Sequence, residues 1–186
     1  MDAYGRRSAG AGGAEWRRPV LGVDIGGVVI QRTGDEGDTS FFGETPMLTP
    51  AVPGAFDALA GLARDEFRDR VHLVSKAKLA TVDRTLRWLD LHDFTERTGI
   101  PVDRLHFVPE RADKAPVCAR LGVTHFVDDR IDVLRHLGDV PYRYLFTGGG
   151  GTEDPAAIPE WARQAAAWTE LAEVIRLSVR ATRGGG

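Results

Sequence analysis

The sequence lacks several features that define large classes of protein. It contains one cysteine, Cys118, so no disulfide can form within the chain, and a reducing, cytoplasmic compartment is expected. No segment approaches the roughly 18 consecutive apolar residues of a membrane-spanning helix. The five histidines are scattered without the spacing of a zinc site, and the formal net charge of -3 gives no general attraction to nucleic acid. We therefore expect neither a membrane nor a nucleic-acid partner.

The amino-acid composition is typical of a globular protein. Hydrophobic residues make up 42% and charged residues 27% of the 186 residues, which suits one domain with its own core. The N-terminal stretch MDAYGRRSAGAGGAEWRRP contains basic side chains but no apolar segment of a signal peptide. We expect a flexible leader over residues 1–18, a single domain over 19–180 and a flexible tail over 181–186.

Apolar, β-branched segments alternate with segments of helical periodicity along this domain. The pattern predicts strands within 20–30, 71–74, 105–108, 124–127 and 142–146. It predicts helices that begin at Pro53 and that span 79–91, 115–121, 131–137 and about 159–179. The glycine run from Gly148 to Thr152 is predicted to be a linker. This alternation is typical of an α/β protein, and we expect a Rossmann-like parallel sheet of about five strands with helices on both faces.

Polar side chains stand where these strands end. Asp24 ends the apolar core of the first strand, Ser75 and Lys76 follow the second, Lys114 comes shortly after the third, and Asp128–Asp129 follow the fourth. In parallel sheets, ligands bind at the carboxyl ends of the strands. Clustered carboxylates repel one another unless a cation lies between them. Oxygen ligands beside a lysine and a hydroxyl favour Mg²⁺ together with a phosphoryl group.

In chain order, these segments resemble the four motifs of the haloacid dehalogenase-like (HAD) superfamily. VLGVDIGGVVI is similar to the motif whose strand ends in the nucleophilic aspartate, and HLVSKA to the strand that ends in serine or threonine. PERADKA has a lysine at the place of the third motif, and HFVDDR resembles the acidic fourth motif. The resemblance covers about residues 20–146 and implies a phosphatase that uses Mg²⁺.

The resemblance also implies a role for each residue. Asp24 would be the nucleophile that forms an aspartyl-phosphate, since an ionised carboxylate needs no base for this attack. The backbone carbonyl of Gly26 and one or both of Asp128 and Asp129 would complete the Mg²⁺ site with Asp24. The side chains that would bind phosphoryl oxygens are those of Ser75, Lys76 and Lys114. The substrate would be a small phosphorylated molecule, either a nucleotide or another metabolite.

Gly26 departs from the usual pattern of this superfamily. Its phosphatases carry a second aspartate at this position, whose side chain protonates the leaving group and activates water, a contribution of roughly 10²–10⁴-fold. The glycine keeps the backbone oxygen for the metal and removes the proton donor. We expect a substitute from the acidic loop that follows, which contains Asp35, Glu36, Asp38 and Glu44.

The same residues also have structural interpretations. Asp24 and the doublet Asp128–Asp129 would serve as helix caps, Ser75 as a turn former, and Lys114 as a solvated charge at a helix end. For the whole protein, the absence of a side chain at Gly26 leaves a second interpretation open. The chain would then be a non-catalytic HAD-fold protein that binds a phosphorylated ligand or a protein partner. A receiver-like signalling domain fits less well, because its acidic pair follows the first strand.

The spacing of the motifs leaves little room for an inserted domain. About 50 residues separate Asp24 from Ser75, and a helix fills much of that length. We therefore expect a capless protein whose open site suits a large substrate or closure by a partner subunit. The predicted last helix carries Trp161 and Trp168, and we expect these side chains to pack the helix onto the domain. A contact in a homo-oligomer is the alternative role for the two tryptophans.

Overall fold

A parallel sheet forms the centre of the structure, a computed structural model that describes residues 18–33, 42, 45–150 and 158–184. Its six strands lie in the order β3-β2-β1-β4-β5-β6, and all neighbouring pairs are parallel. The strands are β1 (Leu21–Val23), β2 (Val71–Lys76), β3 (Leu105–Val108), β4 (His125–Asp128), β5 (Tyr142–Phe146) and β6 (Ala162–Ala165). This order is typical of Rossmann-like sheets, and it reverses between β1 and β4.

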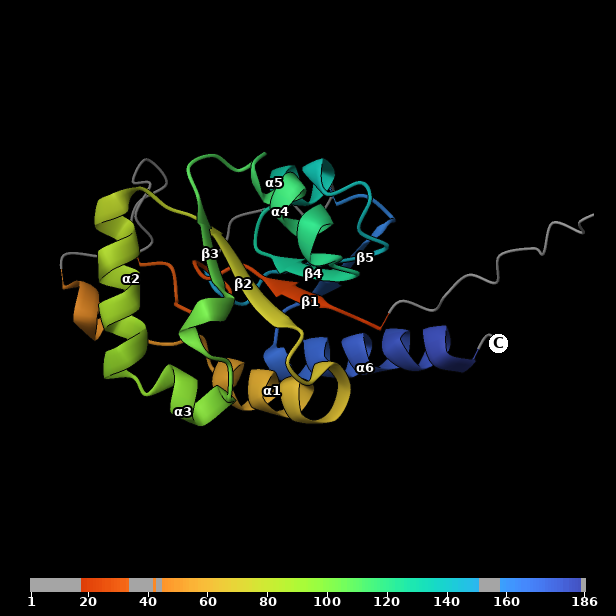
Figure 1. The fold of residues 1–186 in the computed structure, drawn as a ribbon, viewed down its shortest axis with the longest axis horizontal. Coiled ribbons are helices and arrows are strands. Elements are labelled where there is room, and N and C mark those ends of the chain that lie inside the picture. The colour runs from red at the N-terminus through yellow and green to blue at the C-terminus, as the bar shows by residue number, and fades with distance from the viewer. Residues whose placement is uncertain (1–17, 34–41, 43–44, 151–157, 185–186) are drawn as a thin grey trace, which may run out of the picture.

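Helices cover both faces of the sheet, as Figure 1 shows, with α4 and α5 on one face and α1 and α6 on the other. The helices are α1 (Ala55–Leu62), α2 (Leu79–Leu91), α3 (Phe94–Thr98), α4 (Lys114–Leu121), α5 (Ile131–His136) and α6 (Trp168–Gly184). Shorter helical turns are η1 (Pro46–Leu48), η2 (Ala63–Phe67) and η3 (Val102–Arg104). The α/β fold expected from the alternating pattern is confirmed.

The sheet separates two apolar cores. Leu59 of α1 and Ile175 of α6 belong to the core on one face, whereas Leu134 of α5 belongs to the core on the other. Phe126 and Val127, neighbours on β4, belong to opposite cores because successive side chains of a strand point to opposite faces. The central strands are buried on both faces, which explains why their sequences read as continuous apolar runs.

The C-terminal region differs from the prediction. The helix expected over about 159–179 is divided into the strand β6 and the helix α6, and β6 pairs with β5. The sheet therefore has six strands instead of about five. Residues 181–184, which were expected in a flexible tail, continue α6. The guanidinium of Arg183 donates to the carboxylate and to the carbonyl of Glu66, both at 3.1 Å, and this attaches the last turns of α6 to η2.

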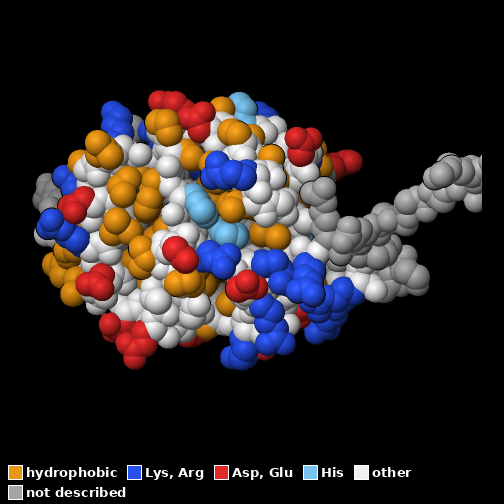
Figure 2. Space-filling view, viewed as in Figure 1, with side chains coloured by type: hydrophobic (Ala, Val, Ile, Leu, Met, Phe, Trp, Pro, Cys, Tyr) orange, Lys and Arg blue, Asp and Glu red, His pale blue; other side chains and the backbone are white. Residues whose placement is uncertain are grey.

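Large hydrophobic side chains are exposed at a few places. Leu86 and Leu91 on α2 and Val102 on η3 are exposed, and Figure 2 shows hydrophobic side chains on the side of the molecule where α2 and α3 lie. Within the described part of the chain, no helix is long and apolar enough to cross a membrane.

The two tryptophans expected on one helix have different surroundings, and this difference gives a stability prediction. Trp168 is fully buried, and its Nε1 donates to the carbonyl of Val28 at 2.7 Å. Trp161 is 38% exposed, with the guanidinium of Arg143 3.9 Å from its ring centre. Trp168→Ala should lower the free energy of unfolding by about 3–5 kcal/mol. Trp161→Ala, the matched control, should cost no more than about 1 kcal/mol. Urea denaturation of both variants checks this, and equal losses would contradict the packing described here.

Candidate active site

Two carboxylates emerge side by side at the centre of the sheet. Asp24 follows β1 directly, and Asp128 is the last residue of β4. The two strands are paired in a register that aligns Val23 with Val127, and the N–H of Asp24 donates to the carbonyl of Val127 at 2.9 Å. This is the point at which the strand order reverses, and ligands of Rossmann-like proteins bind in the crevice that forms there.

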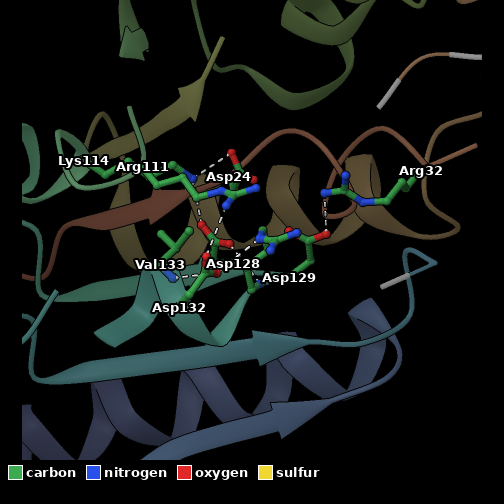
Figure 3. Close-up of polar contacts among 9 residues, drawn as sticks. Asp24, Arg32, Arg111, Lys114, Asp128, Asp129, Asp132 and Val133 are labelled. Atoms are coloured by element: carbon green, nitrogen blue, oxygen red, sulfur yellow. Dashed lines mark hydrogen bonds and ion pairs between the residues drawn. The ribbon is translucent and has the colours of Figure 1, made fainter. Parts of the chain in front are cut away.

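Lys114, the first residue of α4, lies between these two carboxylates. Its Nζ is 3.0 Å from Oδ1 of Asp24 and donates to Oδ2 of Asp128 at 2.7 Å, as the close-up in Figure 3 shows. Burial alone would lower the pKa of Lys114, but the charges of Asp128 and Asp24 outweigh it, and the pKa lies above its ordinary value. The residue is only 1% exposed. The interpretation as a solvated charge is therefore wrong, and the ammonium group is held in its charged form.

The two aspartates of the doublet have different partners. Asp128 uses both oxygens, because Oδ2 accepts from Lys114 and Oδ1 accepts the N–H of Arg130 at 3.0 Å. Oδ2 of Asp129 accepts from the guanidinium of Arg32 at 2.9 Å. Oδ1 of Asp129 is buried and has no hydrogen-bond partner among the described residues. From the sequence, Asp128 and Asp129 were equally good candidates for a metal ligand. In the described part of the structure, only Asp129 of the two has an oxygen available for a further ligand.

The pKa values of both aspartates of the doublet lie above their ordinary value. Burial raises the pKa of both carboxyls, and the charge of Asp24 adds to this effect. Lys114 opposes it at Asp128 and Arg32 opposes it at Asp129, but in both cases the net shift is upward. A cation near Asp24 and Asp129 would oppose this upward shift, since its charge would favour the ionised carboxylates.

The arrangement fits a hard divalent cation. One carboxylate oxygen from each of Asp24, Asp128 and Asp129 lies within 4.8 Å of the other two. All three residues are buried, and an all-oxygen donor set is the type that Mg²⁺ prefers. Oδ1 of Asp24 and Oδ1 of Asp129 are both buried without a hydrogen-bond partner among the described residues. Lys114 Nζ lies 3.0 Å from the Asp24 oxygen, so the Asp129 oxygen has the greater need of a ligand. The backbone oxygen of Gly26 stays a predicted ligand.

Sequence reasoning missed Arg32. This residue lies in the loop after β1, where a single basic side chain gives no periodic signal. Besides its ion pair with Asp129, its backbone N–H donates to the carbonyl of Gly149 at 3.1 Å. Arg32 therefore connects the loop after β1, the segment after β5 and the acidic cluster, and its bond to Oδ2 fixes the orientation of the Asp129 carboxylate.

The glycines after β5 belong to the site and not to a linker. A Cβ added at Gly149 would overlap the carbonyl oxygen of Gly27. Gly27 itself has a φ of 74°, and a Cβ there would overlap Oδ2 of Asp129. The two glycines allow the segment after β5, the loop after β1 and the acidic cluster to approach one another closely. Gly151 and Thr152, the rest of the predicted linker, lie outside the described residues.

Ser75 and Lys76 lie at the same edge of the sheet but do not join the cluster. They are the last two residues of β2, which pairs with β1 so that Leu73 is aligned with Val23. Ser75 is buried and Lys76 is half-buried. In the part of the chain that the structure describes, neither side chain makes a hydrogen bond or an ion pair. Their contact with a phosphate stays a prediction.

The four acids proposed as proton donors cannot be placed. Asp35, Glu36, Asp38 and Glu44 lie outside the described residues. Their role stays a hypothesis from the sequence.

Among the comparisons with known proteins, matches are found with solved structures. No protein-family model matches the sequence. No match is found among curated proteins. The solved structure of a haloacid dehalogenase-like family hydrolase from Xanthomonas campestris is similar with a TM-score of 0.57 and 14% identity, over 88% of this chain and 97% of that one. A haloacid dehalogenase-like hydrolase from Burkholderia xenovorans aligns over 66% of this chain and 58% of its own, with 16% identity and a TM-score of 0.49. The chain therefore has a Rossmann-like α/β fold similar to that of the hydrolase from Xanthomonas campestris, as the resemblance of its four motifs implied.

The close approach of Gly149 to Gly27 predicts a specific cost for a side chain at this point. Gly149→Ala should lower the free energy of unfolding by about 1–3 kcal/mol, because a methyl group cannot fit without moving the loop after β1. Gly138→Ala is the matched control, since nothing lies within 4 Å of its added Cβ, and it should be neutral or slightly stabilising. Thermal unfolding of both variants measures the difference. Equal stability of the two would mean that the loops do not pack as described.

Proposed function

We propose that this protein is a Mg²⁺-dependent phosphomonoester hydrolase that acts through an aspartyl-phosphate on Asp24. The observation that supports this proposal is the buried cluster in which Lys114 lies between Asp24 and Asp128, and in which one oxygen of Asp129 has no hydrogen-bond partner in the described part of the chain. The similar fold of the hydrolase from Xanthomonas campestris agrees with it. The coarser conclusion, a hydrolase with a HAD-like fold, agrees with the same observations.

Asp24 is proposed as the nucleophile. One of its carboxylate oxygens would form a bond to phosphorus while the bond from phosphorus to the ester oxygen breaks, and the alcohol leaves with a proton from an acid or from water. A water molecule would then attack the phosphorus of the aspartyl-phosphate, which releases inorganic phosphate and restores the carboxylate. Asp24 is mostly buried, and its Oδ1 lies 3.0 Å from the ammonium group of Lys114, so the carboxylate is held in place for this attack.

Lys114 would stabilise charge during both steps. In the absence of substrate, its ammonium group lies between the carboxyl groups of Asp24 and Asp128 and contacts both. When a phosphoryl group is bound, the same group would face the negative charge that spreads over the phosphoryl oxygens. Ser75 and Lys76 are proposed as further contacts to those oxygens, since they end the neighbouring strand β2.

Asp24, Asp129 and the backbone oxygen of Gly26 are proposed to hold the Mg²⁺, and Asp128 to lie beside them. Asp128 is a weaker candidate for direct ligation than Asp129, because Lys114 and the N–H of Arg130 already use its two oxygens. When bound, Mg²⁺ would neutralise negative charge on the phosphoryl group and the carboxylates. Arg32 and Lys114 hold the protein oxygens in position for it.

Gly26 has no side chain, so the leaving-group proton would come from another residue. The four acids of the following loop, Asp35, Glu36, Asp38 and Glu44, are the proposed source. Alanine substitution at each of the four positions tests this source, since turnover that survives all four substitutions excludes it. We also propose that the protein has no cap domain, which leaves its site open to a nucleotide or another phosphorylated metabolite.

Phosphate release from a panel of phosphomonoesters with Mg²⁺ tests the proposed function. The wild type should release phosphate from at least one ester, and chelation with EDTA should abolish the release. Asp24→Asn should reduce kcat/KM by more than about 10³-fold, because an amide oxygen cannot replace the nucleophile. Asp57→Asn, which changes an exposed acid on α1, is the charge-matched control and should retain activity.

Two outcomes of this assay would lead to other conclusions. Turnover that persists in Asp24→Asn would exclude the phosphoenzyme. Absence of release from every ester at high enzyme concentration would favour the alternative that Gly26 keeps open, a HAD-fold protein that binds a phosphorylated ligand or a protein partner without turnover.

A further inference from the structure

Two histidines on neighbouring strands contact each other near the beginnings of these strands, away from the strand ends that form the candidate active site. His72 is the second residue of β2, and His106 is the second residue of β3. Nδ1 of His72 and Nε2 of His106 are 3.1 Å apart, and the two ring centres are 5.2 Å apart. β3 is the edge strand of the described sheet and pairs with β2. The histidine contact therefore joins the edge strand to the rest of the sheet.

Arg104 sets the direction of hydrogen bonding in this pair. Its NH1 is 3.5 Å from Nε2 of His72, and a guanidinium group can only donate. In the arrangement that satisfies all three groups, Nε2 of His72 accepts, and Nδ1 of His72 carries a hydrogen that it donates to Nε2 of His106. Both rings are then neutral, since each has one accepting nitrogen. An additional proton on either ring would place two donors against each other.

Charged side chains from the surrounding segments face the pair. Arg104 of η3 acts on both rings and Arg120 of α4 acts on His106, and both positive charges oppose a protonated imidazole. The negative charges that favour a protonated ring are those of Asp69, in the turn before β2, and Asp103 of η3. The side chains of these two acids are 74% and 79% exposed. Because water and salt screen exposed charges, the acids compensate a positive charge on the rings only weakly.

Burial is the main reason why the two rings favour their neutral form. His72 is 6% exposed, and burial, followed by the electrostatic effects of His106 and Arg104, lowers its pKa to about 4. Burial, followed by the charges of Arg120 and Arg104, also lowers the pKa of His106. An imidazole that is released into water has a pKa of about 6.5. The closed contact therefore binds fewer protons than an open one, so a fall in pH below about 6.5 favours opening.

We propose that the contact between His72 and His106 is a pH-sensitive joint that holds β3 on β2 at neutral pH and releases it in mild acid. The joint is closed when both rings are neutral. It opens when either ring gains a proton, because the added charge faces Arg104 and the hydrogen bond between the rings loses its acceptor. β3 leads into α4, whose first residue is Lys114, so the released strand belongs to the same β–α unit as the candidate active site. This inference does not depend on the proposed phosphatase activity.

Hydrogen–deuterium exchange, measured by mass spectrometry on the full chain, tests the joint. The protection of peptides that cover β3 and α6 is compared at about pH 7.5 and about pH 5, after correction for the intrinsic exchange rate at each pH. The test variant combines His72→Asn with His106→Gln, because both amides retain hydrogen-bonding groups near the original ring nitrogens and neither titrates. The matched control is His136→Gln, which changes an exposed histidine on α5.

In the wild type, the protection of β3 should fall by about 30-fold between these two conditions, because each pH unit below about 6.5 raises the opening constant about tenfold. The double variant should lose less than about threefold, since no proton is taken up at the joint. The control His136→Gln should behave like the wild type, and α6 should lose less protection than β3. A fall in β3 protection that is equal in the wild type and the double variant would overturn the proposal. An equal fall in β3 and α6 would also overturn it, because acid would then act on the whole domain.

The ring nitrogens of the wild type supply a second test that needs no substitution. Nitrogen NMR of histidine side chains distinguishes the charged ring from the two neutral tautomers. We expect both rings to be neutral at about pH 7.5, with the hydrogen of His72 on Nδ1. In acid, the charged form of the rings should appear together with the loss of β3 protection. A charged ring at about pH 7.5, or a hydrogen on Nε2 of His72, would contradict the joint even if the double variant does not fold.

Discussion

The buried ion pairs of Lys114 are the interaction on which the rest of the site depends. One ammonium group, completely enclosed, contacts carboxylates from two adjacent strands and so links α4 to the carboxyl ends of β1 and β4. Removing one partner of such a buried pair typically costs about 3–5 kcal/mol, because the remaining charge has no compensation. The three carboxyl groups of the cluster contact two cationic side chains, Lys114 and Arg32. Oδ1 of Asp129 is buried and has no hydrogen-bond partner among the residues that the structure describes. A structure stabilised by hydrophobic packing alone would have no need for this arrangement.

The order of strands and helices could be predicted because the apolar runs of the central strands are distinct. The C-terminal region could not be predicted in the same way. The segment Ala162–Ala165 contains alanine, arginine and glutamine, which favour helices, but it lies at the edge of the sheet and pairs with β5. Pairing with a neighbouring strand therefore overrode local preference. The short helix α3 was missed for a different reason. Its five residues are too few to show helical periodicity.

The candidate site divides into a part that follows from the sequence and a part that depends on tertiary contacts. Asp24, Lys114 and the aspartate doublet were predicted because strand ends of a parallel sheet converge at one edge. Arg32 and Gly149 were missed, because loops carry no periodic signal and only the fold brings these two segments together. The different roles of Asp128 and Asp129 also needed coordinates, since adjacent residues of the same type cannot be distinguished by pattern.

The central claim is that Asp24 accepts a phosphoryl group next to a divalent cation. The most direct measurement is a crystal structure of the protein grown with Mg²⁺ and beryllofluoride, which adds to a carboxylate in the way that a phosphoryl group does. We expect beryllofluoride bonded to Asp24, Mg²⁺ bound by Asp24 and Asp129, and the ammonium group of Lys114 beside the fluorine atoms. A beryllofluoride-free Asp24 at saturating concentrations of both ions, or Mg²⁺ bound away from Asp24 and Asp129, would contradict it.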